Sequence, residues 1–307
     1  MKIAILIPCY NAAGFLHKLF EGINAQTTAF DEIICYDDCS TDNTADIARQ
    51  LGAKVITGKV NCGAAYARNR LIEATTCNWI HFHDADDLIH PEFVKVMSTH
   101  VENEQVQLLC NTRVYDLQDT EGRNWIISYS ELKSSIDQVS YFLNNVGFAS
   151  MGLYSKSALT QVSGFDQSLR GNEDPDLHIR LANAGFKIKC VDQFLVEKVE
   201  HPDSFSHQNW FRCMHDKLKC LQKYGILLPP KYFNILGEQA AILSNYFYRE
   251  NDPALSLQAR QLAYQMNVKR IKTSKFSSFI SAMFGVTTYL WIYRRRMDIK
   301  KLTKKAF

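Results

Sequence analysis

The sequence predicts an α/β fold in which a mostly parallel, Rossmann-like sheet carries helices on both faces, followed by an α-helical C-terminal region. Two observations support this prediction. Up to about residue 90, short apolar runs alternate with helical patterns, and beyond Phe205 only helical periodicity remains. Strands that are apolar throughout and separated by helices are typical of parallel sheets with right-handed connections. Ligands of such sheets bind beyond the carboxyl ends of the strands.

The first 90 residues predict a β-α-β-α-β-α-β order. Short apolar runs give strands at residues 3–7, 32–37, 54–57 and 79–82. Apolar residues at helical spacing give helices over residues 15–23 and 45–51, the second ended by Gly52, and a third helix over residues 64–74. The loops that follow these strands are expected to share one edge of the sheet.

The following region predicts an extension of this sheet. A helix is expected to begin at His90-Pro91, because proline is favoured in the first turn, and to run toward Asn103. Strands over residues 106–115 and 125–129 indicate an antiparallel addition. A strand at residues 151–155, a helix over 174–184 and a strand at 187–191 follow, and the α/β core is expected to close near His201.

The last third predicts helices only. Phe211, Met214, Leu218 and Leu221 lie on one helical stripe, and Asp252-Pro253 is a capping pair for a further helix. We therefore expect a helical region over residues 206–307.

Composition indicates an ordinary globular protein. The chain has 307 residues, of which 46% are apolar and 22% charged, enough for one large domain with an appendage or for two modest domains. The nine cysteines are scattered and form no CxxC pair, which favours the cytoplasm over a disulfide-forming compartment and argues against a zinc site. The N-terminal apolar stretch ends at Pro8 and is too short for a signal peptide.

The net charge of +3 hides a basic C-terminal end. Residues 291–307 carry seven Lys or Arg against Asp298 alone, so this end is at +6 and the rest of the chain at −3. A mildly acidic body argues against a nucleic-acid-binding protein, whose positive charge spreads over the folded surface. The pattern suits contact with an anionic membrane surface at one end of the chain.

An aromatic-rich stretch, residues 276–293, precedes the basic tail. Its helical length of roughly 27 Å is marginal for a bilayer core of about 30 Å. Two interpretations stay open. The stretch is an anchor in the interface on the cytoplasmic face of the inner membrane, or it is a helix packed on the chain's own core with a solvated tail.

Acidic residues are concentrated where two predicted strands end. One strand runs into Asp37-Asp38 and another into Asp84-Ala85-Asp86-Asp87. Carboxylates this close repel one another unless a cation compensates, so a divalent metal, Mn²⁺ or Mg²⁺, is expected. The alternative for Asp42 or Asp87 alone is capping of the helix that follows. Neither of the common glycine-rich phosphate loops is present, so a metal would hold the phosphates.

Five short motifs follow one another along the first 206 residues. They are Ile7-Pro8-Cys9-Tyr10-Asn11, Tyr36-Asp37-Asp38-Cys39-Ser40-Thr41-Asp42, Asn61-Cys62-Gly63 with Ala67-Arg68-Asn69, His83-Asp84-Ala85-Asp86-Asp87, and Gly171-Asn172-Glu173-Asp174-Pro175-Asp176-Leu177. Together they resemble the family 2 glycosyltransferases with the GT-A fold. The resemblance implies a GT-A catalytic domain over residues 1–205, with a nucleotide-sugar half to about residue 90 and an acceptor half over 91–205.

The resemblance also assigns roles to individual residues. Asp174 matches the catalytic base of a Glu-Asp pair in which Glu173 shapes the acceptor site. Asp86 matches the metal-binding acid of the DxD motif, and His201 resembles a histidine beside the metal or the diphosphate. Asp38 resembles an acid that accepts a hydrogen bond from the nucleotide base. The nucleotide-binding candidates are Pro8, Tyr10, Asn11, Asp38, Asn61, Gly63, Arg68 and Asp84.

The chemistry of sugar transfer agrees with these roles. A sugar hydroxyl is a poor nucleophile near neutral pH, so a carboxylate such as Asp174 must take its proton as it attacks the anomeric carbon. A metal on Asp86 would neutralise the leaving diphosphate, and a single displacement inverts the anomeric configuration. Residues 208–212 do not match the QxxRW motif of processive synthases. Transfer of one sugar is therefore expected. The resemblance implies a UDP-sugar as the donor and a glycan or lipid-linked acceptor of a cell-surface polysaccharide.

Alternatives stay open for several residues and for the function. His81 and His83 share one strand face, where packing or hydrogen bonding is favoured over zinc binding. The alternative for Asp174 is capping of its own helix beside Pro175. Cys39 stands where the family has a glycine. Two alternatives to a glycosyltransferase remain. One is a catalytically silent nucleotide-sugar-binding scaffold at a membrane. The other is a sugar nucleotidyltransferase, although the glycine-rich loop of that class is missing.

Overall fold

The computed structural model describes residues 1–117, 124–133 and 137–266. The chain divides into two compact units, and the division falls after Trp210, five residues beyond the predicted domain boundary. The predicted anchor and basic tail, residues 276–307, lie outside the described residues.

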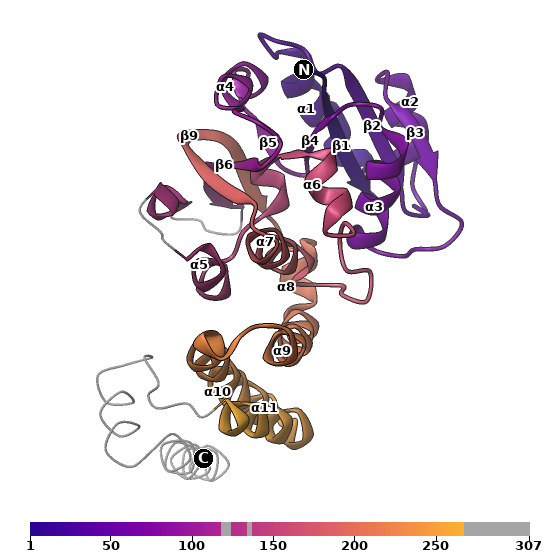
Figure 1. Cartoon of the computed structure of the whole chain (residues 1–307). Helices are drawn as coiled ribbons and strands as arrows, with labels where there is room; N and C mark the ends of the chain where they lie inside the picture. Colours follow the sequence, from indigo (N-terminus) through magenta and orange to yellow (C-terminus); the bar gives the residue numbers. More distant parts are fainter. Residues whose placement is uncertain (118–123, 134–136, 267–307) are drawn as a thin grey trace. The chain divides into compact units, whose positions relative to one another are not determined.

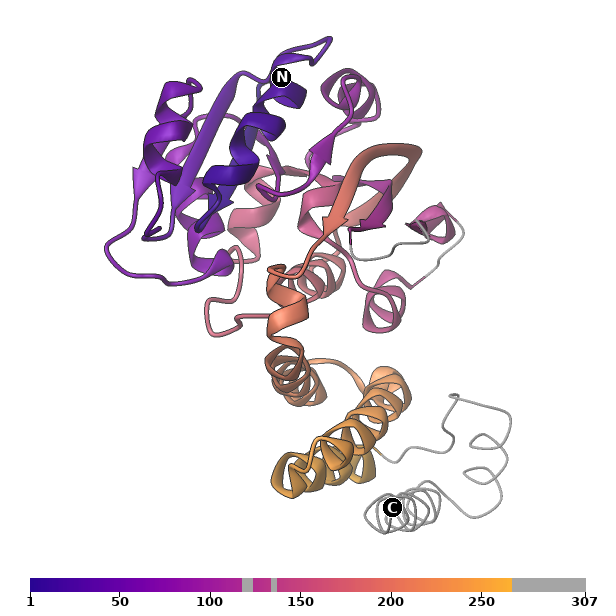
Figure 2. The ribbon, with the colours of Figure 1, turned by 180° about the vertical axis from the view of Figure 1, so that it is seen from behind.

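A parallel layer of four strands forms the N-terminal half of the first unit, in the order β3-β2-β1-β4. The helix α3 covers one face of this layer in Figure 1, and α1 covers the other face in Figure 2. Every side chain from Ile3 to Ile7 of β1 is buried, as the continuous apolar run predicts. The elements are β1 (Ile3–Cys9), α1 (Ala13–Asn24), β2 (Glu32–Asp37), α2 (Thr44–Gln50), β3 (Lys54–Thr57), α3 (Ala64–Ala74) and β4 (Trp79–Phe82).

The rest of the first unit extends this layer into a mixed nine-stranded sheet. The strand β8 pairs antiparallel with both β4 and β6, and β9 pairs parallel with β6. The hairpin of β6 and β7 confirms the predicted antiparallel addition. The strands are β5 (Leu88–Ile89), β6 (Val106–Asp116), β7 (Asn124–Ile127), β8 (Gly152–Ser155) and β9 (Lys187–Glu200). The helices are α4 (Phe93–Thr99), α5 (Gln138–Asn144), α6 (Lys156–Gln161), α7 (Glu173–Asn183) and α8 (Phe205–Gln208), with short 3₁₀ turns at Ser130–Lys133 and Ala149–Met151.

The predicted strand at residues 187–191 and the predicted helix from His90-Pro91 differ from the observed elements in length. The strand expected at residues 187–191 continues to Glu200, because a bulge lets Asp192 and Gln193 leave the ladder between the pairs Cys110–Val191 and Asn111–Phe194. These two polar residues look like a strand end in the sequence. The helix α4 begins at Phe93 and ends at Thr99, shorter than the predicted run toward Asn103.

The described part of the second unit is helical, as predicted. Its elements are α9 (Trp210–Leu227), a 3₁₀ turn at Pro230–Tyr232, α10 (Phe233–Arg249) and α11 (Pro253–Gln265). The predicted cap is present, because the Asp252 carboxylate accepts a hydrogen bond from Leu255 N at 2.9 Å. Ser244 and Ser256 join α10 to α11 by hydroxyl-to-carbonyl bonds of 2.9 and 2.7 Å. Within residues 1–117, 124–133 and 137–266, no helix has both the length and the hydropathy to cross a bilayer.

Candidate active site

The predicted acidic clusters lie at one edge of the sheet. The strand β2 ends at Asp37, just before Asp38, and β4 ends just before His83 and Asp84. Both strands pair in parallel with β1, which lies between them. Adjacent strands are about 4.8 Å apart, so the two clusters are separated by about 10 Å along this edge. Their placement matches the edge that the sequence predicts.

Asp38 organises the loop that contains two other nucleotide-binding candidates. Its buried carboxylate accepts hydrogen bonds from Cys62 N at 2.9 Å and from Gly63 N at 2.6 Å. Gly63 has φ +86°, and a Cβ there would lie 2.2 Å from Arg170 Nη1. Arg170, which the sequence did not single out, donates to both the side-chain and backbone oxygens of Asn61 at 3.2 Å. The loop is therefore held from both sides, and only glycine fits at its centre.

The first motif packs against the loop after β2. Asn11 accepts a hydrogen bond from Thr41 N at 2.8 Å, and its own backbone N donates to Ser40 Oγ at 2.9 Å. Pro8 remains in β1, whereas the Tyr10 ring is about half exposed beside this edge. Cys39 has φ +64°, which explains why glycine suits this position in the family pattern.

Arg68 connects the two halves of the first unit. Its buried guanidinium donates through Nη2 to Asp84 Oδ1 at 2.8 Å and through Nη1 to Glu173 Oε1 and Asp174 Oδ1, both at 3.0 Å. Burial would lower the pKa of Arg68, but Asp174 and the other two carboxylates raise it. The sequence assigned Arg68 to the nucleotide, and the structure places it among three candidate catalytic or binding acids.

The helix-capping alternative for Asp174 is wrong. The residue before the first turn of α7 is Asn172, at φ +65°, and Asp174 lies inside the helix. The Asp174 carboxylate leaves its own helix and accepts hydrogen bonds from Arg68 and, at 3.0 Å, from Ala149 N. Behind it, the His178 ring donates to the Asp174 carbonyl oxygen at 2.7 Å. The predicted base is thus fixed at both its carboxylate and its backbone.

The acids around Arg68 differ in their affinity for protons. Burial, reinforced by Asp174, raises the pKa of Glu173 to about 7 in spite of Arg68. Burial acts in the same direction on Asp84, but Arg68 and Lys198 hold its pKa below the ordinary 3.8. Asp84 therefore stays ionised at neutral pH, whereas Glu173 exchanges a proton there.

Asp86 and His201 form the candidate metal site. Asp86 Oδ2 lies 3.0 Å from His201 Nε2, and the His201 ring stacks on Phe15 at 5.0 Å between centroids. Two ligands at about 2.1 Å from one octahedral cation lie about 3 Å apart when they are at right angles. The pair therefore fits two adjacent positions around Mg²⁺ or Mn²⁺. In the part of the chain that the structure describes, no group of three or more His, Cys, Asp or Glu side chains is arranged to hold a metal.

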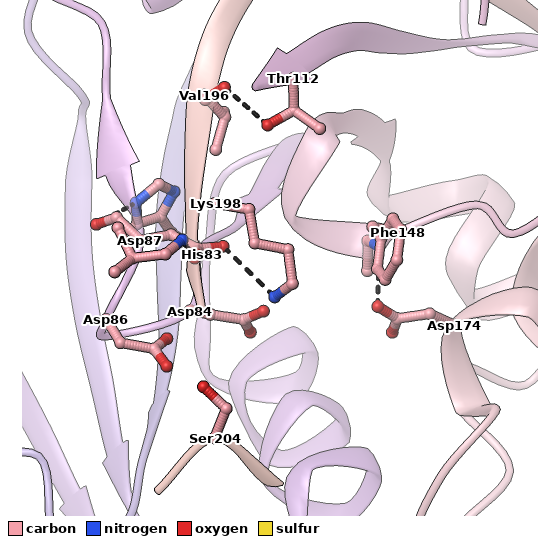
Figure 3. Close-up of polar contacts among 12 residues, drawn as sticks. His83, Asp84, Asp86, Asp87, Thr112, Phe148, Asp174, Val196, Lys198 and Ser204 are labelled. Carbon is pink, nitrogen blue, oxygen red and sulfur yellow. Dashed lines mark hydrogen bonds and ion pairs between the residues drawn. The ribbon is translucent and has the colours of Figure 1, made fainter. Parts of the chain in front are cut away.

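Asp87 and Lys198 are the largely buried residues at the acidic turn, residues 84–87. Asp87 is buried and accepts from Val199 N at 3.0 Å, so it anchors the turn to β9 rather than capping a helix. Lys198 Nζ lies 3.9 Å from Asp87 Oδ2. Figure 3 shows the Lys198 side chain extending toward Asp84. Asp174 lies further along, and the Arg68 guanidinium bonds to both acids. Sequence reasoning missed Lys198, because a lysine in a Val-Glu-Lys-Val-Glu pattern resembles an exposed strand residue.

His81 and His83 are buried and hydrogen-bonded, as the packing and hydrogen-bonding interpretation predicts. Contacts of 2.8, 3.0 and 3.3 Å link Gly152 O, the two rings and Asp87 O in that order. Burial lowers the pKa of both rings, that of His83 to about 4. Two neutral rings carry two N–H groups for three contacts, so the tautomers of the two rings decide which contact has no proton.

Comparison with known proteins decides the family. Residues 4–162 match the model of "Glycosyl transferase family 2", about half of the chain. The chain belongs to this family. It is 35% identical over 102 residues to the "Uncharacterized glycosyltransferase YibD" of Escherichia coli K12, a match that covers 32% of this chain and 30% of that relative's length.

Two solved structures show that this family 2 chain has the GT-A fold. One is S. aureus TarS 1-349 in complex with UDP-GlcNAc, with a TM-score of 0.59 and 15% identity over 90% of this chain and 98% of that one. The other is the mannosyltransferase PcManGT of Pyrobaculum calidifontis with GDP-Man and Mn²⁺, with a TM-score of 0.57 and 15% identity over 99% and 88% of the two chains.

Proposed function

We propose that the chain is an inverting glycosyltransferase that moves one sugar from a nucleotide-diphosphate sugar to an acceptor hydroxyl. The observation that carries the proposal is the arrangement around Arg68, where Asp84 from the nucleotide half and the Glu173–Asp174 pair from the acceptor half lie on one guanidinium. A transferase needs groups for both substrates within the reach of one sugar.

Asp174 is the proposed base. Its carboxylate is held by Arg68 and Ala149 N, each through one of two oxygens, so each oxygen keeps a lone pair for a proton. The acceptor oxygen forms a bond to the anomeric carbon while its proton passes to Asp174, and the bond from that carbon to the diphosphate breaks. Glu173, beside it, positions the acceptor.

The donor is proposed to lie along the edge between Asp38 and Asp84. The separation of about 10 Å suits a nucleoside at one end and a diphosphate at the other. The remaining residues of this site are Pro8, Tyr10, Asn11, Asn61, Gly63 and Arg68. Asp86 and His201 would hold Mn²⁺ or Mg²⁺, which supplies charge neutralisation at the leaving diphosphate. One solved neighbour is described with UDP-GlcNAc and another with GDP-Man and Mn²⁺, which supports both groups here.

The acceptor is proposed to be a glycan or a lipid-linked saccharide of a cell-surface polysaccharide. Contact with an anionic membrane surface through residues 291–307 is part of this proposal and rests on the charge pattern of the sequence.

A thermal-shift panel of UDP- and GDP-sugars, each with and without Mn²⁺, tests the donor. A bound donor stabilises the fold by mass action, so at least one sugar nucleotide is expected to raise the melting temperature more with Mn²⁺ than without it. A panel in which no compound shifts the melting temperature would contradict the proposal. Sugar transfer that is lost in Asp174→Asn distinguishes an enzyme from a silent scaffold, and release of pyrophosphate from a nucleoside triphosphate would indicate a nucleotidyltransferase instead.

A further inference from the structure

Lys198 places a second cation among the acids of the site. It lies on β9, three residues before His201, and its side chain is only 18% exposed. Its ammonium lies 3.9 Å from Asp87 Oδ2 and 5.6 Å from the centre of the Phe148 ring. Figure 3 shows its ammonium end beside the Asp84–Asp87 turn, on the side that faces Asp174.

The position of the ammonium is not that of a simple counter-ion. A charge-assisted hydrogen bond closes to about 2.8 Å, but the ammonium stays 3.9 Å from Asp87 Oδ2, and that oxygen has no hydrogen-bond partner. Among residues 1–117, 124–133 and 137–266, no acceptor lies within hydrogen-bond distance of Lys198 Nζ. The three N–H donors of the ammonium are therefore available to a ligand.

The neighbouring acids keep this ammonium charged without binding it. Asp84 Oδ1 accepts from Arg68 and Asp86 Oδ2 lies 3.0 Å from His201 Nε2, whereas neither acid is within hydrogen-bond distance of Lys198 Nζ. Burial would lower the pKa of Lys198, but Asp87, Asp84 and Asp86 raise it above its ordinary value. A charged, partly desolvated ammonium without an acceptor suits a hard anionic oxygen such as that of a phosphate.

We propose that Lys198 is a further catalytic residue, whose ammonium donates to an oxygen of the donor's sugar-bearing phosphate. This inference rests on the proposed function. When the bond between the anomeric carbon and the phosphate oxygen breaks, the electron pair stays on that oxygen, and the acceptor's proton passes to Asp174. The charge that appears on the phosphate is then met by Lys198, which is unchanged at the end of the reaction.

The test compares Lys198→Met with Lys189→Met. Lys189 lies on the same strand, but its side chain is exposed and paired with Glu102, so its variant controls for the loss of one charge. Binding of UDP, GDP and the two free nucleosides is measured by isothermal titration in the presence of Mn²⁺. Lys198→Met is expected to bind the diphosphate that the wild type prefers roughly 10- to 100-fold more weakly, with nucleoside affinity unchanged, and Lys189→Met to bind like the wild type.

A double variant separates a phosphate contact from an effect that passes through Asp87. In the Asp87→Asn background no buried carboxylate is left unpaired, so Lys198→Met remains testable there, and it is expected to cost the same factor. Equal diphosphate affinity with and without Lys198, in either background, would overturn the inference while the proposed function stands. A wild type that binds neither UDP nor GDP would overturn both.

Discussion

Arg68 and Asp174, 106 positions apart in the chain, are joined by a hydrogen bond of 3.0 Å between Nη1 and Oδ1. Since the same guanidinium holds Asp84 at 2.8 Å, the place of the proposed base depends on a helix of the nucleotide half. The proposed donor and acceptor sites therefore share one structural element, α3.

Replacement of Arg68 tests that element. Arg68→Met leaves three carboxylates without their cation and is expected to lower the free energy of unfolding by about 3–5 kcal/mol at pH 7. The loss should shrink toward pH 4, because the acids can then take up protons. Urea unfolding at the two pH values measures it. Arg70→Met is the control on the same helix, because the Arg70 side chain is 37% exposed and pairs only with Glu73 among the ion pairs of the described residues. Equal losses for the two variants would contradict this account of Arg68.

The proton affinity of Glu173 predicts a pH dependence. Its pKa is raised from 4.5 to about 7, so between these values the unfolded chain loses a proton that the folded chain keeps. This residue therefore contributes a penalty that grows as pH rises through that window and is constant above it. Glu173→Gln removes the penalty, so the variant should gain stability relative to the wild type between pH 5 and pH 8. A stability difference that is the same at both pH values would count against the raised pKa.

Two glycines with positive φ form a matched pair. Gly63 has φ +86° and would place a Cβ 2.2 Å from Arg170 Nη1, whereas Gly52 has φ +94° and open space around it. Alanine strains the backbone at both positions, and at Gly63, with φ +86° and ψ 169°, by about 1–3 kcal/mol. Gly63→Ala is expected to lower the melting temperature further and to weaken binding of the nucleotide, since the Asp38 contact lies at the same residue. Thermal melts and UDP or GDP titrations of both variants measure this, and indistinguishable behaviour would contradict the collision.

The metal proposal predicts a distinction between two histidines. His201→Ala is expected to weaken Mn²⁺ binding, measured by titration in the presence of UDP or GDP, by at least about tenfold. His207→Ala should leave it unchanged, because His207 is exposed and lies 3.8 Å from Glu200. Mn²⁺ affinity that survives His201→Ala would show that Asp86 does not share a metal with His201.

Much of the nucleotide half could be predicted from the sequence. The observed β2, β3 and β4 have the predicted bounds, because short runs rich in β-branched and aromatic residues favour strands. Short elements were missed, because β5 and α6 are too brief to show a period and depend on tertiary contacts. The helix α6, for example, is fixed by Ser155, whose hydroxyl accepts a hydrogen bond from Ala158 N.

The site residues that lie in sequence motifs could be predicted. The contacts that the sheet topology brings about could not. The sequence singled out Asp84, Asp174 and Arg68, but it contained no sign that one guanidinium joins them. Lys198 enters the site only because the bulge at Asp192 and Gln193 allows β9 to continue along β6. A contact that depends on the length of a bulged strand has no local signature.

Sugar transfer by Asp174→Asn tests the central claim most directly. With the donor found in the thermal-shift panel, the variant is expected to bind that donor like the wild type and to transfer its sugar about 100- to 10,000-fold more slowly, because it lacks the carboxylate that takes the acceptor's proton. Transfer at the wild-type rate, with an intact fold, would show that the carboxylate beside Arg68 is not the base.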